Sequence, residues 1–363
     1  MTDKKIAILS MQRVVNFGSV LQAYSLREIL RELTDATVTF MDIDENTAIP
    51  CLPSARDHGD YVAPAAYPKG ILQKGKRWII ARLSARNKYF IQRFMRDQLQ
   101  LAAAPSIEHY DCVVVGSDEV FNHSKGIRLQ LHGGVEQTDR VISYAASCGS
   151  AEISAIPVKH RNQVQAAMEH FSGMSVRDAA TQEYVKALYS GAITRHLDPV
   201  LVGRLSQRKH MPVRIKNYLL VYAYGQRIRT AEEIDAIRKF AKDRNLKTVA
   251  MGGSQFWCDL YIPTTPFRLL DYFYHADYVV TDTFHGTIFS VINKKRFGVI
   301  VRESNCNKLT DLLQVLGLED RQIFRMSDLE QTVEKNIDYD AVETILAQER
   351  IRTRDYLKKH LEG

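Results

Sequence analysis

A single histidine stands in the stretch of this sequence that is best suited to chemistry, residues 278–293. The stretch reads YVVTDTFHGTIFSVIN, and its pattern predicts a buried strand, a polar turn and then a helix. In open α/β sheets, ligands bind beyond the carboxyl ends of strands and close to helix N-termini, whose free N–H groups favour anions. The candidate ligand-binding residues of this turn are therefore Asp282, Thr283, His285, Gly286 and Thr287. A structural interpretation stays open, in which Asp282 or Thr283 caps the helix and His285 is a satisfied turn residue.

Further polar residues follow predicted strands in the N-terminal half of the chain. They are Asn16, Ser117, Asp118, Asn122, Ser147, Arg177 and Asp178. Together with His285 they provide carboxylates, hydroxyls, a guanidinium and an imidazole, a mixture that suits an anionic donor and a polyhydroxyl acceptor. Polar turn residues are usually structural, so three alternatives stay open. Asn16 then shapes its turn, Asp118 caps a helix, and Arg177 forms a salt bridge with Asp178 or another carboxylate.

Apolar strand-like runs alternate with amphipathic helical patterns along the chain, which predicts parallel sheets with right-handed crossovers. A polar, basic stretch at residues 203–216 interrupts this alternation and is predicted to be a linker. We therefore expect an α/β protein with two Rossmann-like domains, residues 1–202 and 217–338, in a GT-B-like arrangement with an inter-domain cleft. Residues 339–363 are expected to form a helix that packs back across the linker, and residues 45–75 a loop.

Composition limits the classes of protein to which the chain can belong. Its 363 residues and 45% hydrophobic content suffice for two domains. The sequence contains no run of ~18 apolar residues, so it predicts no transmembrane helix. The N-terminus does not resemble a signal peptide, and we therefore expect a cytoplasmic protein. Five scattered cysteines without a C-x-x-C pair argue against disulfides and a structural zinc site. The sequence also lacks the H-E-x-x-H, P-loop and G-x-S-x-G motifs.

The net charge of +7 is concentrated in a basic segment, residues 74–96, where aromatic and aliphatic residues interleave at near-helical spacing. This pattern favours an amphipathic helix with a solvated basic face. A functional alternative is attraction to a phosphorylated or lipid-linked substrate, which would bring the protein to the inner face of the membrane. We expect no nucleic acid partner.

Six motifs occur in an order that resembles the polysaccharide pyruvyl transferase family. They are NFGSVLQAYSL from Asn16, VGSDEVFN from Val115, SYAAS from Ser143, SVRD from Ser175, Asp198-Pro199, and TDTFHGTIFS from Thr281. The resemblance covers residues 5–302. It implies a fold similar to GT-B glycosyltransferases and transfer of the pyruvyl group of phosphoenolpyruvate onto sugar hydroxyls as a ketal, in surface-polysaccharide (exopolysaccharide) biosynthesis. It also implies that no metal or other cofactor is required.

The resemblance places the family's histidine on His285 and the arginine of its V-R-D motif on Arg177. Several members carry an arginine two positions before the histidine, where this chain has Thr283. We expect His285 to act as general acid or phosphate ligand, Arg177 to clamp an anion, and Asp118 to bind or deprotonate an acceptor hydroxyl. The acceptor, on the N-terminal domain, would be a saccharide, lipid- or nucleotide-linked, and the donor would lie on the C-terminal domain. Two alternatives stay open: a GT-B glycosyltransferase that uses a nucleotide-sugar, and a non-catalytic binding protein of the same fold.

Overall fold

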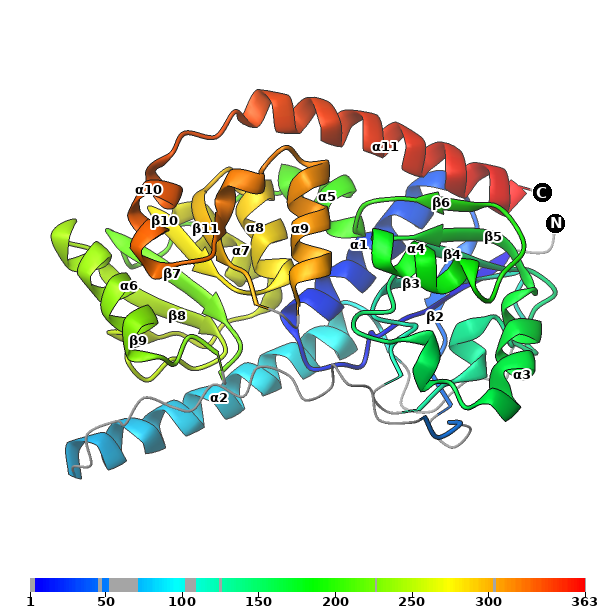
Figure 1. Cartoon of the computed structure of the whole chain (residues 1–363), viewed down its shortest axis with the longest axis horizontal. Helices are drawn as coiled ribbons and strands as arrows, with labels where there is room; N and C mark the ends of the chain where they lie inside the picture. The colour runs from blue at the N-terminus through cyan, green and yellow to red at the C-terminus, as the bar shows by residue number, and fades with distance from the viewer. Residues whose placement is uncertain are drawn as a thin grey trace.

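The computed structural model shows two α/β domains, each built on one sheet of six parallel strands (Figure 1). It describes residues 4–44, 48–51, 71–101, 109–123, 126–225, 227–302 and 305–362. Each sheet has helices packed against it, and the domains lie side by side in a GT-B-like arrangement. The predicted fold class is therefore confirmed.

The N-terminal sheet has the strand order β2-β1-β3-β4-β5-β6. Its strands are β1 (Lys5–Leu9), β2 (Thr37–Phe40), β3 (Cys112–Asp118), β4 (Val141–Ala146), β5 (Phe171–Val176) and β6 (Ile193–Arg195). Its helices are α1 (Phe17–Leu33), α2 (Ile71–Asp97), α3 (Val158–Met168), α4 (Ala179–Lys186) and α5 (Pro199–Val202). The strand order reverses between β1 and β3, and crevices at such switch points are where open α/β sheets bind ligands.

The C-terminal sheet has the order β12-β11-β10-β7-β8-β9, with its switch point between β10 and β7. Its strands are β7 (Tyr218–Ala223), β8 (Lys247–Gly252), β9 (Leu260–Tyr261), β10 (Tyr278–Thr281), β11 (Arg296–Ile300) and β12 (Gln322–Ile323). Its helices are α6 (Ala231–Asp243), α7 (Pro266–His275), α8 (Phe284–Ile292), α9 (Cys306–Val315) and α10 (Leu329–Glu334), and α11 (Tyr339–Glu362) ends the chain.

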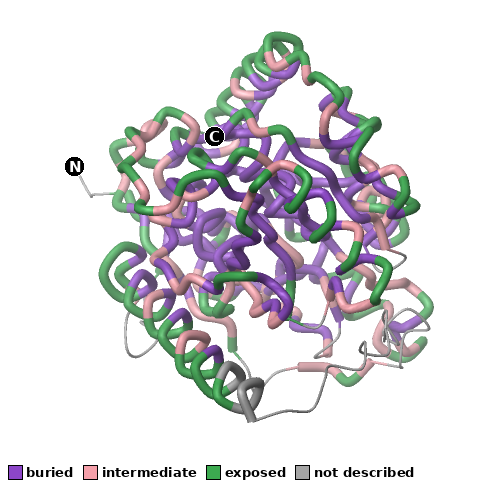
Figure 2. Tube along the Cα trace, turned by 90° about the vertical axis from the view of Figure 1, so that its left-hand side faces the viewer, coloured by how far each residue is buried: buried purple, intermediate pink, exposed green. Residues whose placement is uncertain are grey.

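Burial on both faces explains why the central strands read as continuous apolar runs. All six residues of β7 and of β4 are buried, as expected for parallel strands that are covered by helices on each side. Figure 2 shows buried segments through the middle of the molecule and exposed segments on the outer helices. One apolar core continues between the domains and includes Leu21 of α1, Leu201 of α5, Phe289 of α8 and Leu357 of α11.

The last helix, α11, returns from the C-terminal domain and lies along the N-terminal domain (Figure 1). The Tyr356 hydroxyl donates a hydrogen bond of 2.8 Å to the backbone carbonyl of Ser143 in β4, and Arg354 pairs with Glu32 of α1. Between the two sheets, the chain passes through a 3-10 turn at Arg204–Gln207 and then runs without regular structure to β7. The segment predicted as linker therefore lies between the two sheets.

Several elements differ from the sequence-based expectation. The loop expected over residues 45–75 is wrong at its end, because α2 begins at Ile71; residues 45–47 and 52–70 lie outside the described part of the chain. The two-residue strands β9 and β12 and the helices α3 and α10 were not predicted. None of the described helices is long and apolar enough to span a membrane.

Loss of the Tyr356 side chain should weaken the docking of α11. Tyr356 is 8% exposed, so Tyr356→Ala should lower the free energy of unfolding by about 3–5 kcal/mol, and Tyr356→Phe by about 1 kcal/mol through the lost hydrogen bond. Ile351→Ala, on the same helix but 61% exposed, should change it by less than ~0.5 kcal/mol. Urea titration of the three variants measures this, and equal costs for Tyr356→Ala and Ile351→Ala would show that α11 is not docked.

A buried histidine should make this docking sensitive to acid. His196 lies with its ring centroid 4.7 Å from that of Tyr356, and burial, with the charge of Arg352, lowers the pKa of His196 to about 4. The unfolded chain takes up this proton near pH 6.5. The free energy of unfolding should therefore fall between about pH 6.5 and pH 4, by up to ~3 kcal/mol from this group. Urea titrations across this range should give a shallower slope for His196→Gln than for the unsubstituted protein; identical slopes would contradict the assignment.

Candidate active site

The polar turn after β10 places His285 at the N-terminus of α8. Thr283 is the N-cap of this helix, and its Oγ1 accepts a hydrogen bond of 2.9 Å from the backbone N–H of Gly286. Thr283 therefore has the structural role that the sequence left open, whereas His285 lies beyond the cap, in the first helical turn. His285 is 8% exposed.

Both ring nitrogens of His285 lie close to residues of the N-terminal domain. Its Nε2 lies 3.6 Å from Oδ2 of Asp198, which is the N-cap of α5. Its Nδ1 faces Gly18 in the first turn of α1, where a methyl group would overlap the imidazole ring. The imidazole therefore sits where α1, α5 and α8 begin. Figure 1 shows these helices at the junction of the two domains.

Asp198 connects this histidine to Arg177. The Asp198 carboxylate is fully buried, and its Oδ2 lies 3.1 Å from a guanidinium nitrogen of Arg177 and 3.4 Å from the Ser117 hydroxyl. Burial alone would raise the pKa of Asp198, but the close approach of His285 and the charge of Arg177 outweigh burial and hold this pKa below its ordinary value. The ionised carboxylate can fix which ring nitrogen of His285 carries a proton.

Arg177 itself is buried and only partly satisfied. Its guanidinium stacks on the Phe284 ring at 4.1 Å, and its partner is Asp198 rather than Asp178, whose side chain instead caps α4. Arg177 Nε, His285 Nε2 and Asp282 Oδ1 are buried atoms without a hydrogen-bond partner among the described residues. Unpaired buried polar atoms are rare in folded proteins, and a bound water, ion or ligand is one way in which they are satisfied.

Asp118 ends β3 in a strained conformation at the switch point of the N-terminal sheet. Its φ of +68° is in the left-handed region, which few residues other than glycine adopt. Its Oδ2 accepts a hydrogen bond of 2.6 Å from the Ser19 hydroxyl of α1. Asp118 therefore does not cap a following helix, and its carboxylate is held half-buried beside the start of α1.

Asp282 belongs to a separate ion-pair network on the C-terminal domain. Its Oδ2 lies 3.0 Å from Arg302 Nε and 3.8 Å from Arg227, and Arg302 also contacts Glu233 at 2.6 Å. The backbone carbonyl of Asp282 accepts from the Asn305 amide. The network holds the turn that precedes α8, and Asp282 thereby helps to fix the position of the helix that carries His285.

The remaining predicted site residues serve local structure. Asn16 caps α1 by accepting from the Gly18 N–H. Gly286 is enclosed, because a methyl group there would overlap the hydroxyls of Thr281 and Thr283, and the Thr287 hydroxyl donates to the Thr283 carbonyl. The hydroxyl of buried Ser117 points to Asp198, and the Asn122 amide donates to Glu119. No ligand contact is required to explain these five residues.

Three features of the site were missed from the sequence. Asp198 was noted only as part of a motif, yet it joins His285 and Arg177. Gly18 appears in the sequence only within the NFGSVLQAYSL motif, but its missing side chain makes room for His285. Glu119 was not considered, although it bridges to Lys308 of α9 at 2.6 Å.

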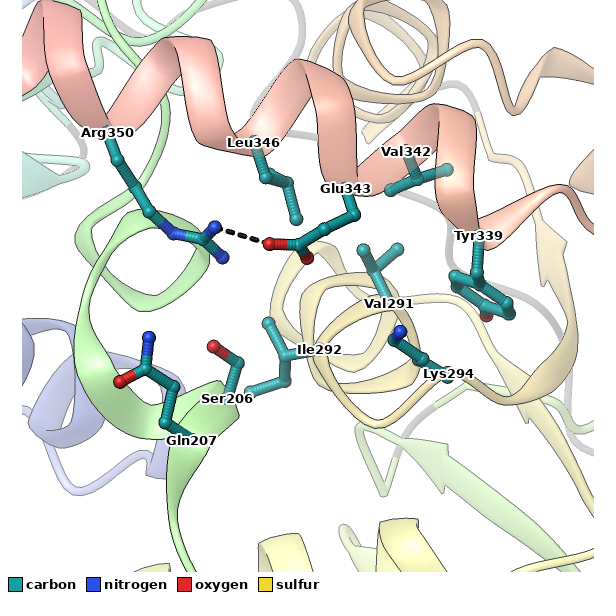
Figure 3. A pocket seen from close by; sticks show the side chains of 10 residues that line it. All are labelled: Ser206, Gln207, Val291, Ile292, Lys294, Tyr339, Val342, Glu343, Leu346 and Arg350. Carbon is teal, nitrogen blue, oxygen red and sulfur yellow. Dashed lines mark hydrogen bonds and ion pairs between the residues drawn. The ribbon is translucent and has the colours of Figure 1, made fainter.

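A cavity of about 200 Å³ lies away from these residues, between α11, the end of α8 and the 3-10 turn at Arg204–Gln207 (Figure 3). Its apolar wall includes Val291 and Leu346, and Glu343 forms an ion pair with Arg350 above it. None of the predicted site residues lines it. In the described part of the chain, no three His, Cys, Asp or Glu side chains gather closely enough to hold a metal ion.

A methyl group at position 18 should disturb the site directly. Gly18→Ala places its side chain in the space of the His285 ring, and such overpacking should lower the free energy of unfolding by about 1–3 kcal/mol. Gly75→Ala is the matched control, because no atom of the described residues lies within 4 Å of the added methyl group in α2, and it should be stabilising by about 0.5–1 kcal/mol. Chemical denaturation distinguishes the two, and an unaffected Gly18→Ala variant would show that His285 does not pack here.

Comparison with known proteins gives the family. A search of curated proteins found no match. Among solved structures, the UDP-GlcNAc 2-epimerase of Methanocaldococcus jannaschii in complex with UDP-GlcNAc and UDP is similar at a TM-score of 0.48, with 11% identity over 95% of this chain and 99% of that chain. CalG4, the calicheamicin glycosyltransferase, has a TM-score of 0.46 and 13% identity over 100% of this chain and 99% of that chain. A family model, polysaccharide pyruvyl transferase, matches residues 16–304. Because this match covers most of the sequence, the chain belongs to the polysaccharide pyruvyl transferase family.

Proposed function

We propose that this protein transfers the pyruvyl group of phosphoenolpyruvate onto two hydroxyls of a sugar, forming a ketal and releasing phosphate. Its membership of the polysaccharide pyruvyl transferase family indicates a transferase of polysaccharide biosynthesis. The observation that carries the proposal is the group of Arg177, Asp198 and His285, which joins a cation and a proton-transfer residue at the junction of two domains. The proposal needs no metal or other cofactor.

The donor carries a carboxylate and a phosphate, and Arg177 is suited to bind one of them. A guanidinium recognises such groups with charge-assisted hydrogen bonds, and the Arg177 Nε–H has no partner among the described residues. Stacking on Phe284 and the contact with Asp198 hold the guanidinium in one orientation. Binding therefore requires little further ordering of this side chain.

His285 supplies the proton chemistry. Protonation of the donor's methylene carbon creates a cationic centre at C2, which one sugar hydroxyl attacks. A second hydroxyl then takes the place of the phosphate, which leaves, and the carbon that was protonated becomes the methyl group of the ketal. The hydroxyls lose two protons, of which one balances the methyl group and one leaves with phosphate. His285, oriented by Asp198, acts as general acid or phosphate ligand.

The acceptor hydroxyls lie on the N-terminal domain in this proposal. The Asp118 carboxylate, held by Ser19, binds or deprotonates a hydroxyl there. A lipid-linked or nucleotide-linked saccharide is the proposed acceptor. The helix α2 carries Trp78 at 60% and Ile79 at 53% exposure, and its contact with a phosphorylated carrier or the membrane face stays a prediction.

Phosphate release from phosphoenolpyruvate in the presence of a panel of sugar acceptors tests the proposal, with the ketal identified by mass spectrometry. His285→Gln should lower the rate by about 10²–10⁴-fold because the proton donor is lost. His275→Gln, on an exposed residue at the end of α7, should keep the full rate.

Two results would contradict the proposal. One is full activity of the His285→Gln variant. The other is absence of phosphate release with every acceptor, together with thermal stabilisation by uridine or guanosine diphosphate but not by phosphoenolpyruvate. The second result would favour a glycosyltransferase that uses a nucleotide-sugar.

A further inference from the structure

The proposed donor carries two anionic groups, whereas the group of Arg177, Asp198 and His285 contains one permanently charged cation, Arg177. Thr283 is neutral, and its hydroxyl is used in capping α8. Arg302 is held between two carboxylates, Asp282 and Glu233, at 3.0 and 2.6 Å. A second permanently charged group would therefore have to come from another element near these residues.

Lys308 is the candidate for this second cation, because it pairs with Glu119 and the charge of Arg177 acts on it. It lies in the first turn of α9, and its ammonium group reaches the N-terminal domain, where it pairs with Glu119 at 2.6 Å. The two side chains are 23% and 29% exposed, so a solute can reach this pair. Glu119 directly follows Asp118, and the charge of nearby Arg177 acts on both partners of the pair.

The surroundings of Glu119 strongly favour the ionised form of its carboxyl group. The charge of Lys308 outweighs burial and, with smaller effects of Arg177 and Asn122, lowers the pKa of Glu119 to about 2. Gly149 leaves room for this carboxylate, because a methyl group there would approach Glu119 Oε2 to 2.6 Å. The environment around Glu119 therefore has the properties of an anion-binding site, filled by a side chain of the protein itself.

We propose that Lys308 binds the second anionic group of the donor, and that Glu119 occupies this position until the donor displaces it. The inference rests on the proposed function and assigns a specificity-determining pair for it. Lys308 supplies from α9 the cation that Thr283 does not supply from α8. Glu119 sets the affinity, because the donor must compete with it.

A structural salt bridge and an exchangeable anion site predict different effects of substitution. If the pair were only structural, Lys308→Met and Glu119→Gln would both cost stability and leave donor affinity unchanged. In the exchange model, Lys308→Met removes the contact and should weaken phosphoenolpyruvate binding at least 10-fold. Glu119→Gln removes the competing charge and should strengthen binding about 3- to 10-fold.

A second ion pair between α9 and the N-terminal domain provides the control. Arg195 contacts Asp311 at 2.5 Å, farther along α9, so Arg195→Gln also breaks an inter-domain pair. This variant should keep the dissociation constant of the unsubstituted protein within about 2-fold. Lys308→Arg, which retains the charge, should recover most of the affinity that Lys308→Met loses.

Isothermal titration of the full chain with phosphoenolpyruvate, and separately with inorganic phosphate, measures these effects without turnover. Dissociation constants that shift in opposite directions for Lys308→Met and Glu119→Gln support the inference. Shifts of the same sign, no shift in either variant, or no binding of either probe to the unsubstituted protein would overturn it. Opposite shifts without phosphate release from any acceptor would instead leave the anion site in place and contradict the proposed function. If Lys308→Met fails to fold, Glu119→Gln alone decides, because only the exchange model predicts tighter binding.

Discussion

The contact between His285 and Asp198 is the interaction on which the site depends, because it joins the two domains at one buried point. Each partner stands at the start of a helix, and both helices contribute to the apolar core that continues between the domains. A buried carboxylate is costly unless cations or hydrogen-bond donors face it, and here the Arg177 guanidinium and the His285 ring do so. The arrangement of the domains and the environment of Asp198 are therefore coupled, because a displacement of one domain would separate His285 from Asp198 and leave Arg177 as its ion-pair partner.

The topology explains why so many polar residues gather here. Parallel sheets direct the carboxyl ends of all their strands to one edge, and switch points such as β1/β3 and β10/β7 are where open α/β sheets bind ligands. Several of the gathered residues cap helices, as Asn16 and Thr283 do. The residues left with unpaired buried atoms, Arg177 and His285 among them, are the ones that the scaffold positions but does not satisfy. This difference singles out Arg177 and His285, whereas Asp282, which shares it, belongs to an ion-pair network, and Asp118 is a candidate through its position at the switch point.

The turn at residues 278–293 could be predicted because its signals are local. A buried strand, an N-cap and an apolar helix face are visible in consecutive residues, and the structure confirms them as β10, Thr283 and α8. The partnership of His285 with Asp198 and Gly18 could not be predicted, because it joins three elements distant in sequence and depends on how the domains pack. The two-residue strands β9 and β12 are too short for any periodicity to reveal.

A crystal structure of the protein soaked with phosphoenolpyruvate would test the central claim most directly, that Arg177 and His285 hold the donor between the domains. We expect density for the donor between these two side chains, with one anionic group on the guanidinium. Donor density elsewhere in the molecule, with Arg177 and Asp198 undisturbed and nothing beside His285, would contradict it.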